Sequence, residues 1–322
     1  GSVQENEIED KCFQDLGGKR VSGLGRSVNL VSDIKAILII RSAIKNEAPD
    51  VINTHTAKAG VIGRIAAIGT GIKVVHTFHG HLLYGYFPPQ KTKIIILIEK
   101  FLARFTDQII AVGSQVKEDL LAAKIGSESQ YFVIPPAIPS PTFYSKIDAR
   151  RTLGIENSAV VIGWLGRLTA IKHPERVVEL AKRHPSITFI IGGTGELFQD
   201  ISKSNPGNIE MLGWVQPEIF WPSCDIALLT SDNEGLPTAL IEAGLAGLPT
   251  IAENVGSVSE IIKDGITGIL VRGDTERISA LNRLLTDSDL SSQMGVSAQE
   301  YCKSHFGVQS FLSAHLLVYN QK

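Results

Sequence analysis

Short apolar runs rich in β-branched residues alternate along the chain with longer segments of helical periodicity. Buried strands are predicted at 50–55, 73–78, 108–113, 131–136, 160–166, 187–193, 209–213, 226–231, 249–253 and 268–271. Helical patterns fall between them and are clearest at 59–69, 91–105, 174–184 and 237–247. Strands that alternate with helices in this way form βαβ units, so the pattern predicts an α/β fold with parallel sheets covered on both faces.

A proline-rich segment, "VIPPAIPSPTF" at 133–143, divides this pattern into two halves and suits a stiff interdomain linker. We predict an N-terminal Rossmann-like domain at 1–138 and a C-terminal one at 139–304, with the last helical segment at 305–322 packing back on the first domain. The second half holds enough strands for a complete doubly wound domain. Two such domains facing a cleft would hold a ligand between the carboxyl ends of their sheets.

The first half offers fewer strands than a complete doubly wound domain. Four are clear, and a fifth is present only if "KRVSGL" (19–24) counts as one. The first fifty residues contain no convincing strand followed by a glycine turn. We therefore expect the first domain to be incomplete at its N-terminus.

Composition excludes several classes of protein. A chain of 322 residues with 43% hydrophobic and 20% charged residues is typical of a globular α/β protein, and its net charge of −2 gives no indication of a nucleic-acid partner. The three cysteines, Cys12, Cys224 and Cys302, lie far apart. This spacing argues against a disulfide framework or a zinc site and favours a reducing, cytoplasmic location. No apolar run reaches the roughly 18 residues that a membrane-spanning helix needs.

Two acids stand in an otherwise small and apolar stretch, "SDNEGLPTALIEAGLAGLPTIA" (231–252). Glu234 is predicted in the loop at the carboxyl end of the preceding strand, where open α/β sheets bind ligands. Pro237 suits the first position of the next helix, and the free N–H groups near Thr238 would attract a phosphate. Glu242, about one helical turn further on, would accept hydrogen bonds from the paired hydroxyls of a sugar or a ribose.

Two other loops offer groups for the same ligand. Arg167 and Lys172 follow the strand at 160–166, where two cations suit a diphosphate. Gly193 and Gly195, in "IIGGTGEL", allow close approach of the backbone to a ligand, although the third glycine of the dinucleotide fingerprint is missing. The alternatives without a ligand are a solvated loop for the two cations, a helix cap for the first acid and a structural arginine partner for the second.

The motifs "LGRL…K", "GGTGE", "LGWV" and the stretch at 231–262 together resemble the donor-binding half of glycosyltransferase family 4, whose members are retaining enzymes of GT-B fold that use nucleotide-diphosphate sugars. The resemblance implies that Arg167 and Lys172 bind the diphosphate. It implies that Glu234 binds the transferred sugar and that Glu242 binds the ribose hydroxyls. It also implies that the remaining donor-binding positions are Gly166, Gly193, Gly195, Val215 near the base, Gly235, Leu236, Pro237 and Thr238.

Histidines gather in the first half, in "NTHTAKAGVIGRIAA" and "VVHTFHGH". A metal held by His79 and His81 would lack a cysteine or carboxylate ligand, and alternate residues of an extended segment point opposite ways, so a polar cleft lining is favoured. The same segments resemble bacterial enzymes that build capsular, exo- or O-antigen polysaccharide. The resemblance implies that His79 reaches the donor sugar near the reacting carbon, with His76 and His81 as alternatives. It further implies a metal-independent reaction with no cofactor, the nucleotide sugar being the donor substrate.

Two other segments have competing interpretations. The segment "KTKIIILIEKFLARF" (91–105) is apolar with basic residues, so it could contact an anionic membrane carrying a lipid-linked acceptor. We favour a buried helix with a few exposed charges over this contact. The Asp-x-Asp sequence at 287–289 follows a helical pattern and indicates a helix-end turn, not a metal-diphosphate site.

Taken with the resemblance, the motifs predict a retaining glycosyltransferase. It would move a hexosyl or N-acetylhexosaminyl group from a nucleotide-diphosphate sugar, with a UDP-sugar favoured, to a hydroxyl acceptor such as a lipid-linked glycan or a cell-surface polysaccharide precursor. In the implied mechanism a donor phosphate oxygen assists deprotonation of the acceptor, while Arg167, Lys172 and the helix start at Thr238 stabilise the leaving diphosphate. Two rivals stay open: a GT-B sugar-nucleotide 2-epimerase and a non-catalytic sugar-nucleotide-binding protein.

Overall fold

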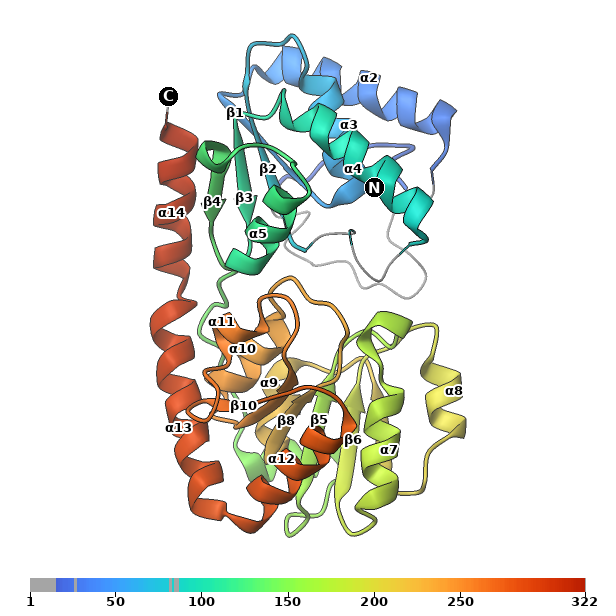
Figure 1. Ribbon diagram of the computed structural model, residues 1–322, viewed down its shortest axis with the longest axis vertical. Helices are drawn as coiled ribbons and strands as arrows, with labels where there is room; N and C mark the ends of the chain where they lie inside the picture. Colours follow the sequence, from blue (N-terminus) through green and yellow to red (C-terminus); the bar gives the residue numbers. More distant parts are fainter. Residues whose placement is uncertain (1–15, 26–27, 81–82, 84–86, 322) are drawn as a thin grey trace. The chain divides into compact units, whose positions relative to one another are not determined.

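The structure, a computed structural model, describes residues 16–25, 28–80, 83 and 87–321. The chain divides into two compact units, drawn with a separate sheet each in Figure 1. The first unit comprises the residues up to Ile134 together with those from His315 onward, and the second comprises Pro135–Ala314. These bounds differ somewhat from the sequence-based bounds of 138 and 305.

The first unit is built on a parallel sheet with the strand order β1-β2-β3-β4. Its strands are Val51–His55 (β1), Lys73–Phe78 (β2), Gln108–Ala111 (β3) and Tyr131–Val133 (β4). Its helices are Leu30–Glu47 (α2), Ala57–Ala67 (α3), Pro89–Ala103 (α4), Ser114–Ala122 (α5) and the 3-10 turn Glu128–Gln130 (η1). The segment 19–24, which the sequence left open as a fifth strand, forms none, and the sheet consists of the four strands that were clear from the sequence.

Small and β-branched residues form the core of the first unit. Ile44 of α2 and two alanines of α3 pack on Val74 of β2. Gly60 of α3 lies directly over His76, because a Cβ at this glycine would lie 2.4 Å from the Cε1 atom of the imidazole. The helix can therefore approach the sheet closely only with glycine at this position.

The second unit is built on a larger parallel sheet with the order β10-β9-β8-β5-β6-β7. Its strands are Val161–Leu165 (β5), Thr188–Gly192 (β6), Ile209–Gly213 (β7), Ile226–Leu229 (β8), Thr250–Glu253 (β9) and Gly268–Val271 (β10). Its helices are Lys146–Leu153 (α6), Glu175–Arg183 (α7), Phe198–Lys203 (α8), Pro217–Phe220 (α9), Thr238–Leu245 (α10), Val258–Ile261 (α11), Asp274–Thr286 (α12) and Ser288–His305 (α13), with 3-10 turns at Ala170–Lys172 (η2) and Trp221–Ser223 (η3).

Side chains of β5 point alternately to the two faces of this sheet, and both faces are covered by apolar residues, as expected for a doubly wound fold. Ile162 and Trp164 pack with apolar residues of α7 and α12 on one face. Val161 packs with Phe220, Trp221 and residues of α10 on the other. The two cores together make this unit an α/β domain of Rossmann type.

The strand order of the second sheet reverses between β5 and β8. After β5 the chain continues through β6 to β7 on one side, whereas β8 returns to the other side of β5 and leads on to β9 and β10. The connections that follow β5 and β8 therefore lead to opposite sides of the sheet, and the carboxyl ends of these two strands form its switch point. Ligands of open α/β sheets bind at this kind of position.

The C-terminal helix, Val308–Asn320 (α14), ends against the first unit. The Nζ atom of Lys73 donates to the Val318 carbonyl at 2.5 Å, and the Asn53 amide donates to the Tyr319 hydroxyl at 2.8 Å. Both contacts fasten the end of the chain to β1 and β2.

Helix α4 departs from the sequence-based expectation of a buried helix. Its buried residues are Glu99, Leu102 and Ala103. Its exposed apolar side chains include Ile94 at 57%, Leu97 at 65% and Phe101 at 51% relative exposure. The buried carboxylate of Glu99 is accepted in the core because Arg64 of α3 pairs with it at 2.6 Å. Periodicity identified the helix but assigned its apolar face to the wrong environment.

Candidate active site

The loops that follow β5 and β8 bring two of the predicted side chains into direct contact. The Nζ atom of Lys172 lies 2.5 Å from Oε1 of Glu234, and the Ser231 hydroxyl donates to the same oxygen at 2.6 Å. The Glu234 side chain is only 8% exposed, so the lysine compensates a nearly buried charge. The acid pairs with a cation from another loop and caps no helix, which contradicts the helix-cap alternative.

Arg167 lies two residues beyond β5 and is exposed. Within the described ranges its guanidinium has no ion-pair partner. Lys172, in contrast, already holds a carboxylate. The site therefore presents one cation that is free to meet an anion and one that would have to share or exchange its partner.

Backbone packing gives a reason for two of the predicted glycines. A Cβ on Gly193, at φ +119°, would lie 1.9 Å from the Gly166 carbonyl oxygen. A Cβ on Gly195, at φ +158°, would lie 2.4 Å from the Leu168 carbonyl oxygen. The loops after β5 and β6 thus touch through their backbones, which requires glycine whether or not a ligand is present.

Helix α10 starts one residue later than the sequence suggests. Pro237 is the N-cap residue, with φ −73° and ψ 110°, and not the first helical residue. Leu236 and Pro237 are buried and Thr238 is exposed at the helix start. The loop before the helix is fixed from a second side, since a Cβ on Gly256 would lie 1.9 Å from the Glu234 carbonyl oxygen. The first N–H groups of α10 lack carbonyl partners within the helix and can receive an anion.

Glu242 has a partner that the sequence did not reveal. The Trp221 indole Nε1 lies 3.3 Å from its Oε2 atom, so the expected alternative of a structural arginine is wrong. Burial raises the pKa of Glu242 to about 7; the indole hydrogen bond lowers it, and the nearby Glu218 carboxylate raises it further. A carboxyl group whose pKa lies near 7 can accept hydrogen bonds from a ligand, and these replace the hydrogen bonds from water that burial has removed.

A cavity of about 430 Å³ opens beside Glu242. It is bounded by Pro217 and Glu218 of α9 and by the proline-rich segment Ile138, Pro139, Ser140, Pro141, Thr142 and Phe143. Val215, predicted near the base of a nucleotide, precedes α9 and packs against the core cluster of Phe220 and Trp221. The cavity supports a ligand position next to the second acid, formed partly by the linker.

His79 belongs to the first unit, where it follows β2. Its Nε2 atom lies 2.9 Å from Nδ1 of His55 at the end of β1. Desolvation lowers the pKa of both imidazoles, and the nearby imidazoles of His79 and His315 lower the pKa of His55 further. His76 is buried and bonded to the Thr54 hydroxyl at 2.8 Å, so it is a core residue and a poor substitute for His79. His81, the other alternative, lies outside the described residues.

Among the residues that the structure describes, no cluster of three or more His, Cys, Asp and Glu side chains is arranged to hold a metal ion. The Asp-x-Asp sequence joins α12 to α13, and Asp287 accepts from the Leu290 N–H at 2.9 Å as the N-cap of α13. This places the sequence in a helix-capping turn.

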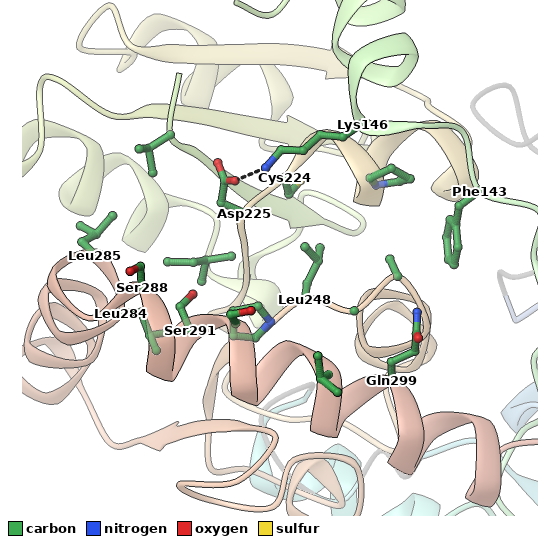
Figure 2. A pocket seen from close by; sticks show the side chains of 18 of the residues that line it. Phe143, Lys146, Cys224, Asp225, Leu248, Leu284, Leu285, Ser288, Ser291 and Gln299 are labelled. Atoms are coloured by element: carbon green, nitrogen blue, oxygen red, sulfur yellow. Dashed lines mark hydrogen bonds and ion pairs between the residues drawn. The ribbon is translucent and has the colours of Figure 1, made fainter. Parts of the chain in front are cut away.

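A second cavity, of about 750 Å³, lies at the opposite edge of the second sheet (Figure 2). Figure 2 shows Lys146 paired with Asp225 on one side and Leu284 with Ser288 and Ser291 on another. Asp225 precedes β8, so this cavity adjoins the amino ends of the strands. None of the predicted site residues lines it.

Comparison with known proteins matches both units to sugar-transferring enzymes. Residues 145–301 match the family model described as glycosyl transferases group 1, and residues 16–140 match the model for glycosyltransferase family 4. The UDP-Gal:alpha-D-GlcNAc-diphosphoundecaprenol alpha-1,3-galactosyltransferase of Escherichia coli is 30% identical over 296 residues, which cover 84% of this chain and 75% of the relative. The capsular polysaccharide biosynthesis glycosyltransferase CapM of Staphylococcus aureus is 23% identical over 309 residues, covering 88% and 80% of the two chains.

Solved structures agree on the fold. The HepE protein of Anabaena in complex with UDP superposes with a TM-score of 0.78 at 22% identity, over 89% of this chain and 82% of that one. The sucrose-phosphate synthase of Thermosynechococcus elongatus superposes with a TM-score of 0.81 at 20% identity, over 90% and 78%. Both similarities confirm the predicted GT-B architecture of two Rossmann-like units.

Proposed function

Because the chain belongs to the group 1 and family 4 glycosyltransferases, we propose that it transfers a hexosyl or N-acetylhexosaminyl group from a UDP-sugar to a hydroxyl acceptor with retention of configuration. The acceptor oxygen forms a bond to the anomeric carbon while the bond from that carbon to the diphosphate oxygen breaks. The hydroxyl proton passes to an oxygen of the departing diphosphate. The observation that supports this proposal best is the contact between Lys172 and Glu234 at the strand-order reversal.

Each of the predicted site residues receives a role in this proposal. Arg167 and Lys172 offset the charge that grows on the diphosphate, which assigns to side chains a role that a metal ion fills in other transferases. Glu234 accepts hydrogen bonds from the sugar once the diphosphate draws the lysine toward itself. Glu242 accepts from the ribose, and the start of α10 at Thr238 donates N–H groups to a phosphate. For His79, in the first unit, the family resemblance implies contact with the donor sugar.

The relatives support the choice of donor and acceptor. The name of the Escherichia coli relative specifies a UDP-sugar donor and a lipid-linked diphosphate acceptor, and the similar HepE structure is a complex with UDP. We therefore infer a UDP-sugar as donor and a lipid-linked glycan as acceptor for this chain, in the synthesis of a cell-surface polysaccharide.

The test is an assay of UDP release from a panel of UDP-, GDP- and ADP-sugars, with and without a polyprenyl-diphosphate-linked sugar. We expect release that depends on the acceptor and a melting temperature raised by UDP, since a ligand at 100 times its Kd stabilises the folded state by about 2.7 kcal/mol. Release without any acceptor would indicate an epimerase-like or hydrolytic reaction and contradict the proposal. Stabilisation by GDP or ADP alone would contradict the inference that the donor nucleotide is UDP.

Helix α4 supports a peripheral contact with the cytoplasmic face of a membrane. Among the described residues, no helix is both long and apolar enough to cross a bilayer. Exposed Ile94, Leu97 and Phe101 share α4 with the basic residues Lys93 and Lys100. An exposed apolar surface flanked by basic residues is typical of helices that lie in the headgroup region of anionic membranes. Such a contact would bring the enzyme to a lipid-linked acceptor.

The double substitution Ile94→Glu and Leu97→Glu is expected to lower binding to anionic phospholipid vesicles by more than about tenfold, because two apolar groups of roughly 1.5–3 kcal/mol each no longer enter the lipid. Co-sedimentation with vesicles measures the effect. The matched control is Ile266→Glu, which changes a residue of the second unit that is 62% exposed. Equal binding by the double variant and the control would contradict a role for α4.

A further inference from the structure

The loops after β5 and β8 are bonded to each other at several points besides the contact between Lys172 and Glu234. The N–H of Asp232 donates to the Ile171 carbonyl at 2.9 Å, and the Thr230 hydroxyl donates to the Lys172 carbonyl at 2.8 Å. The Trp164 indole in turn donates to the Thr230 hydroxyl at 2.9 Å. The backbone that carries the lysine is thus bonded to the backbone that leads to the acid.

The Asp232 carboxylate adds a side-chain bridge between the same loops. Its Oδ2 atom lies 2.6 Å from Nε2 of His173, and its Oδ1 atom lies 2.7 Å from Nη2 of Arg176. Arg176 also donates to the Thr230 carbonyl at 2.7 Å. The other imidazole nitrogen of His173 contacts the Glu175 carboxylate. We call Asp232 with His173 and Arg176 the Asp232 bridge.

The backbone at His173 explains why the lysine depends on this bridge. His173 has φ 48° and ψ 53°, in the left-handed region that few residues other than glycine adopt. The chain turns sharply there between the 3-10 turn that ends at Lys172 and helix α7. Residues held in such conformations need support from the surrounding structure, and the aspartate supplies it from the opposite loop.

We propose that Asp232 and His173 are positioning residues that hold the loops carrying Lys172 and Glu234 in the arrangement which glycosyl transfer requires. This inference rests on the proposed function, because it assigns the lysine to the diphosphate and the acid to the sugar. Glu234 lies two positions after Asp232, and His173 directly follows Lys172, so a shift of the bridge moves both groups. Misplacement of a reacting group by about 1 Å can lower a rate by about a hundredfold.

A purely stabilising role fits the geometry poorly. The side chains of Asp232 and His173 are 48% and 27% exposed, and ion pairs with this exposure contribute little to the stability of a fold. The backbone bonds between the two loops do not involve either side chain. Removing the carboxylate should therefore leave the fold intact and change the direction of the neighbouring side chains.

The test compares Asp232→Ala with Asp232→Asn and Glu175→Ala. We expect Asp232→Ala to lower kcat by about 10–100-fold with a smaller change in the KM for the donor and an unchanged melting temperature. Asparagine keeps an oxygen acceptor and should restore part of kcat. Glu175→Ala removes a carboxylate from the same imidazole without touching the loop after β8, so it should change kcat by less than about threefold.

A double-mutant cycle with His173→Asn separates positioning from unrelated damage, since asparagine tolerates the left-handed backbone. If the two residues act through their contact, the double variant should have nearly the kcat of the worse single variant. Independent effects, or an unchanged kcat in Asp232→Ala, would overturn the inference. If the wild type transfers no sugar, the proposed function fails; the same variants are then compared for UDP binding by calorimetry, where an affinity unchanged by Asp232→Ala overturns the inference as well.

Discussion

Replacing Glu234 with alanine is expected to lower the rate of glycosyl transfer by about 10²–10³-fold while UDP binds nearly as well as before. The carboxylate is proposed to contact the transferred sugar, a part of the donor that UDP does not contain. In the ligand-free site the same carboxylate holds Lys172 at 2.5 Å. Its loss leaves the lysine free to meet the diphosphate, so UDP affinity should not fall. Steady-state transfer kinetics and calorimetric titration with UDP measure the two quantities.

The matched control for this variant is Glu210→Ala, which removes an exposed acid from β7 of the same sheet. It should change neither quantity. Two outcomes would contradict the assignment: transfer that survives in Glu234→Ala within about tenfold, or a parallel loss of UDP affinity that places the acid at the diphosphate. A fall in melting temperature would identify the loss of the ion pair with Lys172 as a structural effect.

Replacing Glu242 with glutamine is expected to make the protein more stable above neutral pH by about 3 kcal/mol, because the pKa of Glu242 rises from 4.5 to about 7 in the folded state. Since the folded protein holds this proton more tightly than the unfolded chain, the stability that it contributes is full below pH 4.5 and is lost as the pH rises through about 7. Glutamine carries no titrating proton, so its variant lacks this slope. Denaturant unfolding at several pH values measures the difference.

The same substitution should change how UDP binding depends on pH. Ribose hydroxyls donate more strongly to a carboxylate than to a neutral acid. The wild type should therefore gain UDP affinity as the pH rises through about 7, whereas Glu242→Gln should show no such rise. Glu210→Gln again serves as the control. A pH profile that is identical in the wild type and in Glu242→Gln would show that this acid does not contact the nucleotide.

Most of the fold followed from local sequence patterns. In the sequence, each βαβ unit is an apolar run followed by a segment of helical periodicity, and this signal does not depend on distant residues. Local patterns were ambiguous in two places. The sequence left open whether residues 19–24 form a strand, and they form none. The apolar residues of α4 were assigned to a core, although the periodicity of a helix does not reveal what covers it.

Only part of the candidate site could be predicted from the sequence. The positions of Glu234 and Lys172 after strands marked them as ligand groups, because the carboxyl ends of parallel strands share one edge of a sheet. Their direct contact joins residues far apart in the chain, and so do the contacts of Trp221 with Glu242 and of Asp232 with His173. No spacing or composition signal distinguishes Trp221 or Asp232 from ordinary core and surface residues.

The sequence by itself therefore determined the α/β class, the strands and the loops that carry the chemistry, since these depend on periodicity and on turn residues within a few positions. Only the tertiary structure decided which side chains neutralise each other. Placing β8 beside β5 brings the loop of Lys172 against the loop of Glu234, and packing η3 near α10 sets an indole on Glu242. Charge pairing and burial depend on distance in space, and chain order does not specify that distance until the sheet is assembled.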